Sequence, residues 1–239
     1  MWAVVPVKQL AQSKQRLADV LSQPQRAALM LAMIEDVLAA LARVRGLNGR
    51  LLVTRDERLH ALAARYGANV LCEDEQLSNA SREENGAPEN GLCRALDEAT
   101  AYLRARDARG MLIVPGDVPL IDASEIEALL AAHRGVTIVP DRNSSGTNAL
   151  LLTPPGSIGF RFGVDSCRRH EQAARDAGLK PQVTRVASLA LDVDTIEDLS
   201  QLRTRGRGTQ AHAVLATFVE GMNANGFGTA HGAPNGNAQ

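Results

Sequence analysis

The stretch MLIVPGDVPLIDASEIEALLAAHRGVTIVPDRNSSGTNALLLTPP, residues 111–155, decides the fold class. It opens on an apolar segment typical of a buried strand, which ends at Pro115. Asp122 and Glu125 then form a capping-type pair, which predicts the start of a helix that runs to His133. Two further apolar segments are expected to be strands, at Val136–Pro140 and Ala149–Thr153. This order of strand, helix and strand is typical of an α/β protein.

Strand and helix patterns alternate over the rest of the chain as well. The other expected strands are Trp2–Val7, Leu51–Thr54, Asn69–Cys72 and Gln182–Ala187. The other expected helices follow an N-cap at Ser22 or cover Glu57–Tyr66, Gly91–Arg106, Asp165–Ala177 and Thr195–Leu202. Strands that are separated by helices favour a mostly parallel, mixed sheet with helices on both faces.

One folded domain is expected over residues 1–205, because the sequence shows no internal repeat and the core pattern stops there. Residues 206–239 are expected to hold a short helix, Thr209–Glu220, and then a disordered tail rich in Gly, Asn and Ala. Between two of the predicted elements, Glu73–Asn90 is polar and has no apolar periodicity. A loop of that length inside a compact domain is usually functional or disordered.

Composition and charge argue against several classes of protein. Hydrophobic residues make up 45% of the chain, aromatic residues only 3%, and the formal net charge is −1. These values predict a soluble protein with an aliphatic core, and neither a nucleic acid nor a membrane is expected as a partner. The three cysteines form no CxxC pair and the N-terminal apolar stretch is too short for a signal peptide, so a cytoplasmic location is expected. A homodimer is left open.

Basic residues gather just after the first expected strand. Lys8, Lys14 and Arg16 all lie in this segment, and no GxxxxGK[ST] loop occurs anywhere in the chain. One interpretation is a solvated basic turn. The other is a cradle for a triphosphate, in which Lys and Arg offset the charge of the phosphates.

Acidic residues follow two later apolar segments. Asp117 comes directly after a strand, and since Asp122 already offers a cap for the next helix, Asp117 is free to act as a Mg²⁺ ligand. Alternation along an extended segment places Asp192 and Asp194 on the same side, where they repel unless a cation lies between them. The alternative is that Asp194 or Thr195 only caps the helix that follows.

The polar segment Asp141–Asn148 leads directly into the predicted strand Ala149–Thr153. Its residues fit an ordinary tight turn, in which Asp, Asn, Ser and Gly are all common. They also fit a loop whose amides and hydroxyls bind an anion, since Gly146 would allow close approach and Thr147 would supply a hydroxyl. The residues of this segment alone do not separate the two hypotheses.

Five motifs occur in the order of a known family: VPVKQLAQSKQRL, VPGDVPL, PDRNSSGTNALLLTPP, FRFGVDSCRRH and LALDVDTIEDL. Together they resemble the 2-phospho-L-lactate guanylyltransferase family of deazaflavin-coenzyme biosynthesis, over roughly residues 1–202. The resemblance implies a single-domain nucleotidyltransferase fold with a mixed α/β sheet. It also implies GTP and Mg²⁺ as requirements, and a phosphorylated three-carbon acid as the acceptor of the guanylyl group.

The resemblance also implies a role for each candidate site residue. Asp117, Asp192 and Asp194 would bind Mg²⁺, and Asp117 and Lys14 would be catalytic. Nucleotide-binding residues would be Lys8, Lys14, Arg16 and Gly91. The acceptor acid would be bound by Thr147, Gly163 and Ser166.

The sequence departs from the family pattern at one position. Relatives usually carry Gly-Leu-Asn before the central helix, whereas this chain has Gly91-Leu92-Cys93. A smaller, weakly polar Cys93 leaves more room for the acid, so 3-phospho-D-glycerate is favoured over 2-phospho-L-lactate or phosphoenolpyruvate. Two other functions stay open at this point, a metal-dependent glycosyltransferase with an Asp-x-Asp motif and a non-catalytic GTP-binding module.

Overall fold

The computed structural model describes residues 1–10, 13–72 and 91–225 of the chain. Its central feature is a seven-stranded sheet with the order β3-β2-β1-β4-β6-β5-β7. The strands are β1 (Trp2–Pro6), β2 (Gly49–Val53), β3 (Asn69–Leu71), β4 (Met111–Ile113), β5 (Val136–Pro140), β6 (Thr147–Leu152) and β7 (Pro181–Val183). Strand β6 runs antiparallel to its neighbours β4 and β5, and the other neighbouring pairs are parallel. The predicted mostly parallel, mixed sheet is therefore confirmed.

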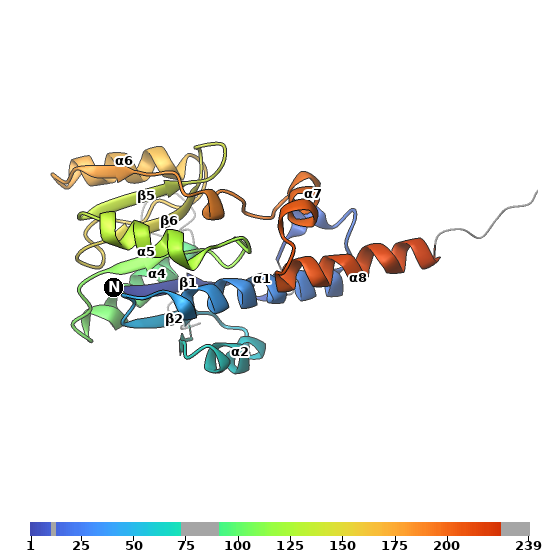
Figure 1. Cartoon of the computed structure of the whole chain (residues 1–239). Coiled ribbons are helices and arrows are strands. Elements are labelled where there is room, and N and C mark those ends of the chain that lie inside the picture. The colour runs from blue at the N-terminus through green and yellow to red at the C-terminus, as the bar shows by residue number, and fades with distance from the viewer. Residues whose placement is uncertain (11–12, 73–90, 226–239) are drawn as a thin grey trace, which may run out of the picture.

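Helices lie on both faces of this sheet (Figure 1). They are α1 (Gln23–Arg43), α2 (His60–Arg65), α4 (Gly91–Arg104), α5 (Ala123–Ala132), α6 (Ser166–Asp176), α7 (Ile196–Arg205) and α8 (Gln210–Asn225). Side chains of β1 alternate between two apolar clusters. Val5 belongs to the cluster that includes α1 and α5, and Val4 belongs to the cluster that includes α4 and α6. The period-2 alternation of a strand thus supplies both cores.

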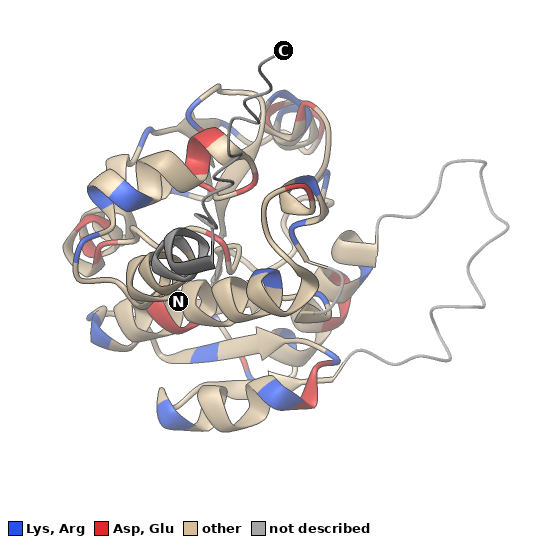
Figure 2. Ribbon diagram, turned by 90° about the vertical axis from the view of Figure 1, so that its right-hand side faces the viewer, with Lys and Arg blue, Asp and Glu red and all other residues tan. Residues whose placement is uncertain are grey.

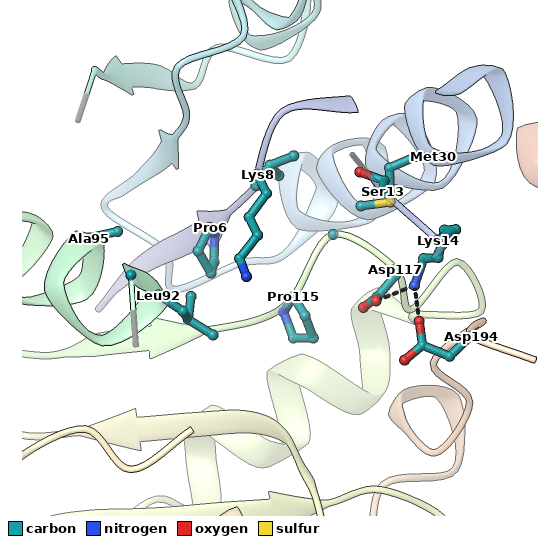
Figure 3. A pocket seen from close by; sticks show the side chains of 13 residues that line it. Pro6, Lys8, Ser13, Lys14, Met30, Leu92, Ala95, Pro115, Asp117 and Asp194 are labelled. Atoms are coloured by element: carbon teal, nitrogen blue, oxygen red, sulfur yellow. Dashed lines mark hydrogen bonds and ion pairs between the residues drawn. The ribbon is translucent and has the colours of Figure 1, made fainter. Parts of the chain in front are cut away.

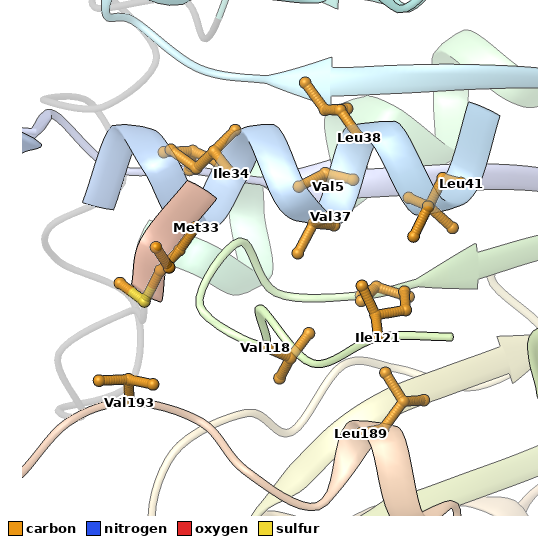
Figure 4. Packing of buried hydrophobic residues seen from close by; sticks show 14 of the residues in the cluster. Val5, Met33, Ile34, Val37, Leu38, Leu41, Val118, Ile121, Leu189 and Val193 are labelled. Atoms are coloured by element: carbon orange, nitrogen blue, oxygen red, sulfur yellow. The ribbon is translucent and has the colours of Figure 1, made fainter. Parts of the chain in front are cut away.

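Helix α1 is the central element of the larger core (Figure 4). Ser22 and Gln25 form the predicted capping box, in which the side chain of each residue accepts a hydrogen bond from the backbone N–H of the other. Ile34, Leu38 and Leu41 are fully buried, as their helical spacing predicts. Leu31 has the same helical spacing from Ile34 but is 37% exposed, because the buried stripe is centred on residues 33–34 and 37–38 and Leu31 lies beside it.

Helix α8 packs against α1 and extends further than the sequence pattern predicts (Figure 1). Ala211 and Leu215 enter the larger apolar cluster. The backbone N–H groups of Gln210 and Ala211 donate to the Asp36 carboxylate on α1, at 2.7 and 2.9 Å. These bonds satisfy the first amides of α8, which have no partner within the helix. Most of the predicted tail, residues 226–239, lies outside the described residues.

Two smaller features complete the description of the fold. The strand predicted at Gln182–Ala187 begins at Pro181 and ends at Val183, and Ala187–Leu189 forms a 3₁₀ turn instead. Acidic and basic residues are interspersed over the helices and loops (Figure 2), and their numbers nearly balance, with a formal net charge of −1. Within the described ranges, no helix is long and apolar enough to cross a membrane.

Candidate active site

A pocket of about 410 Å³ lies at the carboxyl ends of β1 and β4 (Figure 3). These two strands are parallel neighbours at which the sheet order reverses, because β2 and β3 continue on one side of β1 and β4 lies on the other. Ligands of open α/β sheets bind at such switch points. Lys8, Lys14, Gly91, Asp117 and Asp194 are among the lining residues.

The Lys14 ammonium lies between two of the predicted metal ligands. Its Nζ is 2.5 Å from Asp117 Oδ2 and 2.6 Å from Asp194 Oδ1, and both contacts are drawn in Figure 3. The Lys14 side chain is only 4% exposed. Burial opposes its charge, but the two carboxylates outweigh burial and raise the pKa of Lys14. Lys14 also has a φ of 55°, a left-handed conformation that costs a residue other than glycine about 1–2 kcal/mol. The ion pairs hold it there.

The third predicted ligand, Asp192, lies close enough to Asp117 and Asp194 for their charges to affect its pKa. Burial raises the pKa of Asp192, and the negative charges of Asp117 and Asp194 raise it further. A backbone bond from Val193 N–H to the Asp117 carbonyl, at 3.0 Å, ties the two acidic segments together. Asn148, near the start of β6, donates from its side-chain amide to Asp192 Oδ1 at 3.2 Å.

These residues fit a divalent cation in donor chemistry and charge. Asp117 and Asp194 face the Lys14 ammonium, the charge of Asp192 acts on the same carboxylates, and carboxylate oxygens are hard ligands of the kind Mg²⁺ prefers. In the part of the chain that is described, no three acidic, His or Cys groups already converge as a preformed metal cage. The Lys14 ammonium bridges Asp117 and Asp194.

The caps of the neighbouring helices explain why these carboxylates are free for the site. Asp122 caps α5 by accepting from the N–H groups of Ser124 and Glu125, as predicted, so Asp117 has no capping duty. Thr195 caps α7 in a capping box with Asp198. Asp194 therefore does not cap the helix, and its carboxylate bonds Lys14 instead.

Of the remaining residues predicted to bind the nucleotide, two line the pocket and one does not. Lys8 is exposed, lines the pocket, and extends along it in Figure 3. Gly91 lines the pocket at the first residue of α4. Arg16 lies exposed in the 3₁₀ turn Gln15–Leu17 and is not among the described residues that line the pocket.

The polar segment before β6 is a hairpin turn between β5 and β6. The Asp141 carboxylate accepts from the Ser145 N–H at 2.9 Å, and the Asp141 N–H donates to the Gly146 carbonyl at 3.2 Å. A Cβ on Gly146 would lie 2.8 Å from the Asp141 carboxylate, so this glycine accommodates the turn. The tight-turn hypothesis therefore accounts for residues 141–146, and the candidate binding chemistry begins at Thr147.

Two of the three predicted acceptor residues meet in a buried cluster. Ser166 Oγ, at the start of α6, donates to Thr147 Oγ1 at 3.1 Å, and both residues are buried. Gly163 is exposed three residues before Ser166, and its φ of 117° is accessible mainly to glycine. Its carbonyl accepts the Ser166 N–H at 3.2 Å, which joins this loop to the cluster.

His170 also belongs to this cluster, although the sequence analysis gave it no role. Its Nδ1 lies 3.1 Å from Thr147 Oγ1, and its side chain is fully buried. Burial lowers the pKa of His170 to about 4, and the positive charges of Arg169 and Arg161 add to this effect. The available signal was its spacing, since His170 is four residues after Ser166 and therefore on the same face of a helix.

Cys93 lies on the acceptor side of α4. Burial raises the pKa of its thiol, a bond from the Phe162 backbone opposes the shift, and the positive charges of Arg161 and Arg169 act on it. Cys93 and Phe162 both pack against the smaller apolar core. The residue that departs from the family pattern thus lies near the loop that carries Gly163. The loop Glu73–Asn90 lies outside the described residues.

Curated relatives carry guanylyltransferase names. The phosphoenolpyruvate guanylyltransferase of Conexibacter woesei is 39% identical over 88% of this chain and 92% of its own length. The 3-phospho-D-glycerate guanylyltransferase of Colwellia psychrerythraea is 34% identical over 83% and 89%. The 2-phospho-L-lactate guanylyltransferase of Methanobrevibacter ruminantium is 31% identical over 91% of both chains.

Solved structures confirm the fold, and a family model identifies the family. A nucleotidyl transferase from Methanothermobacter thermautotrophicus has a TM-score of 0.60 at 15% identity, covering 90% of this chain and 98% of that one. A cytidylyltransferase from Leptospira borgpetersenii has a TM-score of 0.57 at 10% identity, covering 94% of both chains. The model "Guanylyl transferase CofC like" matches residues 1–219. With the motifs and the relatives in agreement, the chain belongs to the CofC-like guanylyl transferase family.

Proposed function

We propose that the protein transfers GMP from GTP to a phosphorylated three-carbon acid. A phosphate oxygen of the acid attacks the α-phosphorus of GTP, the bond from that phosphorus to the bridging oxygen breaks, and pyrophosphate leaves with the electron pair. The observation that carries the proposal is the pocket in which Lys14 is held between Asp117 and Asp194. It supplies both cationic and carboxylate groups at the place where a nucleotidyltransferase sheet binds its nucleotide.

Charge neutralisation is the main task of such a site, because two anions must meet. Asp117, Asp192 and Asp194 would hold Mg²⁺, which when bound supplies positive charge to the phosphates. Lys8 and Lys14 line the pocket and would offset the charge that develops on pyrophosphate. For Lys14 this requires exchange of its carboxylate partners for phosphate oxygens.

The acceptor would bind at β6 and α6, next to the pocket, because Thr147, Gly163 and Ser166 are not among the described residues that line it. Thr147, Gly163 and Ser166 bring together hydroxyl groups, a glycine turn and the N-terminal end of α6, a combination that suits an anion. No general base is required, because a phosphate monoester has a second pKa of about 6 and is already a dianion for the most part at neutral pH.

Among the three candidate acids, we favour 3-phospho-D-glycerate. Its phosphate is one carbon further from the carboxylate than in the other two acids, so it needs extra room. Cys93, in place of the family's Asn, supports that choice because it lies near the acceptor loop and is smaller than Asn. A specific observation favours phosphoenolpyruvate as the second candidate, since relatives of that name reach 39–41% identity and the 3-phospho-D-glycerate enzyme reaches 34%.

One assay tests the function and the choice of acid. The protein is incubated with GTP, Mg²⁺ and each acid in turn, pyrophosphate is measured, and the three acids then compete for limiting enzyme with products identified by mass. Pyrophosphate release that depends on one of the acids is the expected result. Cleavage of a nucleotide sugar without pyrophosphate release would indicate a glycosyltransferase. Binding of GTP without turnover with any of the three acids would indicate a binding module.

A further inference from the structure

His170 connects three segments that the proposed function assigns to acceptor binding. Its ring is fully buried on α6, with Nδ1 at 3.1 Å from Thr147 Oγ1 at the start of β6. Its other nitrogen, Nε2, accepts the backbone N–H of Arg161 at 2.9 Å. Phe162, the next residue of that loop, stacks edge-on against the ring with 4.8 Å between the centroids.

These contacts determine which ring nitrogen carries the proton. A backbone N–H can only donate, so Nε2 must be the unprotonated nitrogen that accepts from Arg161. In a neutral imidazole the proton is then on Nδ1. Nδ1 therefore donates, and Thr147 Oγ1 accepts.

The Thr147 hydroxyl consequently receives two hydrogen bonds. One comes from His170 Nδ1–H and the other from Ser166 Oγ, each at 3.1 Å. A hydroxyl oxygen has two acceptor lone pairs and one hydrogen to donate. With Ser166 Oγ as the donor of that pair, both lone pairs are engaged, and the Thr147 hydrogen is the group left to donate.

We propose that His170 is a positioning residue for the acceptor acid: its Nδ1–H and the Ser166 hydroxyl fix Thr147 Oγ1 so that the Thr147 hydrogen is directed at an anionic oxygen of the acid. An anion is the matching ligand because it accepts and cannot donate. The inference rests on the proposed function for the identity of the acid. The donor order itself rests only on the contacts of the free protein.

The charged groups around His170 agree with a neutral ring. Arg161 and Arg169 are the charges that act on it, and together with burial they lower its pKa to about 4. The Ser166 backbone opposes this shift, but the net direction is downward. The ring thus stays neutral, with one donor and one acceptor nitrogen, at the pH values where a phosphate monoester is a dianion.

Two variants test the two ring nitrogens of His170 separately. In His170→Asn, the side-chain amide reaches the position of Nδ1 and can still donate to Thr147, but the Arg161 N–H loses its acceptor. In His170→Gln, the amide oxygen reaches the position of Nε2 and still accepts from Arg161, but the donor to Thr147 is lost. Each is measured for the KM of the acid, the KM of GTP, kcat and the melting temperature.

We expect His170→Gln to raise the KM of the acid by about tenfold, the equivalent of one hydrogen bond, and to leave the KM of GTP within about twofold. His170→Asn should keep the KM of the acid within about threefold of the wild type and lower the melting temperature more, because it leaves the partly buried Arg161 N–H unpaired. Equal effects of both variants on the KM of the acid, or a parallel rise in the KM of GTP, would overturn the inference.

A second measurement tests the inference without any turnover. The protein is labelled with ¹⁵N at histidine, and the His170 signals are identified by their loss in His170→Gln. A neutral ring with its proton on Nδ1 at pH 7 is expected, and a proton on Nε2 would refute the donor order whatever the enzyme's activity. If wild-type protein turns over none of the three acids, the proposed function fails. If the wild type is active and His170→Gln has the same KM for the acid, the positioning role fails.

Discussion

Lys14 Nζ lies 2.6 Å from Asp194 Oδ1, although 180 residues separate the two along the chain. The contact joins the segment after β1 to the segment before α7, and Asp117 after β4 completes the ion pair. Lys14 is buried and Asp194 is 40% exposed, so the pair is neither a surface bridge nor a fully buried one. The ammonium therefore offsets the charge of two carboxylates that come from different segments of the chain.

Replacing Lys14 with Met should therefore lower stability as well as activity. The variant leaves Asp117 and Asp194 without their cation, and we expect a loss of about 2 kcal/mol, below the value for a fully buried pair because Asp194 is partly exposed. For a chain of this size that corresponds to roughly 4–8 °C in melting temperature. Thermal melts at pH 7, with and without Mg²⁺, measure the effect.

Added Mg²⁺ should restore more stability to Lys14→Met than it adds to the wild type, because the variant's carboxylates have no competing ammonium. Lys14→Arg is the matched control, since it keeps the charge. It should retain most of the stability and lose part of the activity, because a planar guanidinium does not reproduce the compact ammonium. A Lys14→Met protein that melts like the wild type in the absence of Mg²⁺ would contradict this account of the ion pair.

Asp117→Asn and Asp192→Asn should each reduce turnover by at least about a hundredfold and keep the fold. Each change removes a charge and a metal-type ligand but hardly alters side-chain volume. Asp107→Asn is the control, because Asp107 is exposed with a φ of 53°, a conformation that Asn also tolerates. Pyrophosphate release measures the rates, and near-normal turnover in either site variant would show that the assigned ligand set is wrong.

The sheet and its functional edge could be predicted from the sequence because they depend on local patterns. Apolar runs, the Ser22 and Asp122 caps and the alternation of elements all act within a few residues, and the structure confirms them. The carboxyl ends of β1 and β4 then become the candidate edge through topology alone. A similar local argument predicted that Asp117 does not cap a helix, because Asp122 already caps the next one.

Side-chain partnerships could not be predicted in the same way, because periodicity does not determine which polar groups meet. Lys14 was predicted to bind phosphates, and no local pattern indicated that it would bridge carboxylates 103 and 180 residues away. His170 was missed because its spacing from Ser166 indicates a shared helix face and does not identify the partners of the ring. Its role depends on Thr147 and Arg161, which reach it from β6 and from the loop before α6.

The buried state of His170 predicts a specific loss of stability in acid. Its pKa is about 4 in the folded protein and about 6.5 in the unfolded chain. The unfolded state therefore binds more protons between these values, so the stabilisation is complete above about pH 6.5 and is lost as the pH falls toward 4. The shift corresponds to about 3 kcal/mol at pH 4.

Chemical denaturation of wild type and His170→Gln between pH 4 and 8 measures this contribution. Burial also raises the pKa of Asp192, so only the difference between the two proteins reports on His170. The difference should shrink steadily as the pH falls below about 6.5. A difference that stays constant over the whole range would mean that His170 titrates normally in the folded protein.

Cys93 should control the choice of acid, if the proposed acceptor side is correct. The Cys93→Asn variant restores the family's residue, adds an amide contact and reduces the space beside the loop that carries Phe162. We expect the product ratio in the three-acid competition to move away from 3-phospho-D-glycerate by about tenfold, the effect of one hydrogen bond, while the KM of GTP stays unchanged. Cys72→Asn is the matched control, because it makes the same chemical change at an exposed position. Wild-type product dominated by the lactate or enolpyruvate adduct would refute the favoured acid. A Cys93→Asn variant with the wild-type product ratio would show that the selection lies in other residues of the acceptor side.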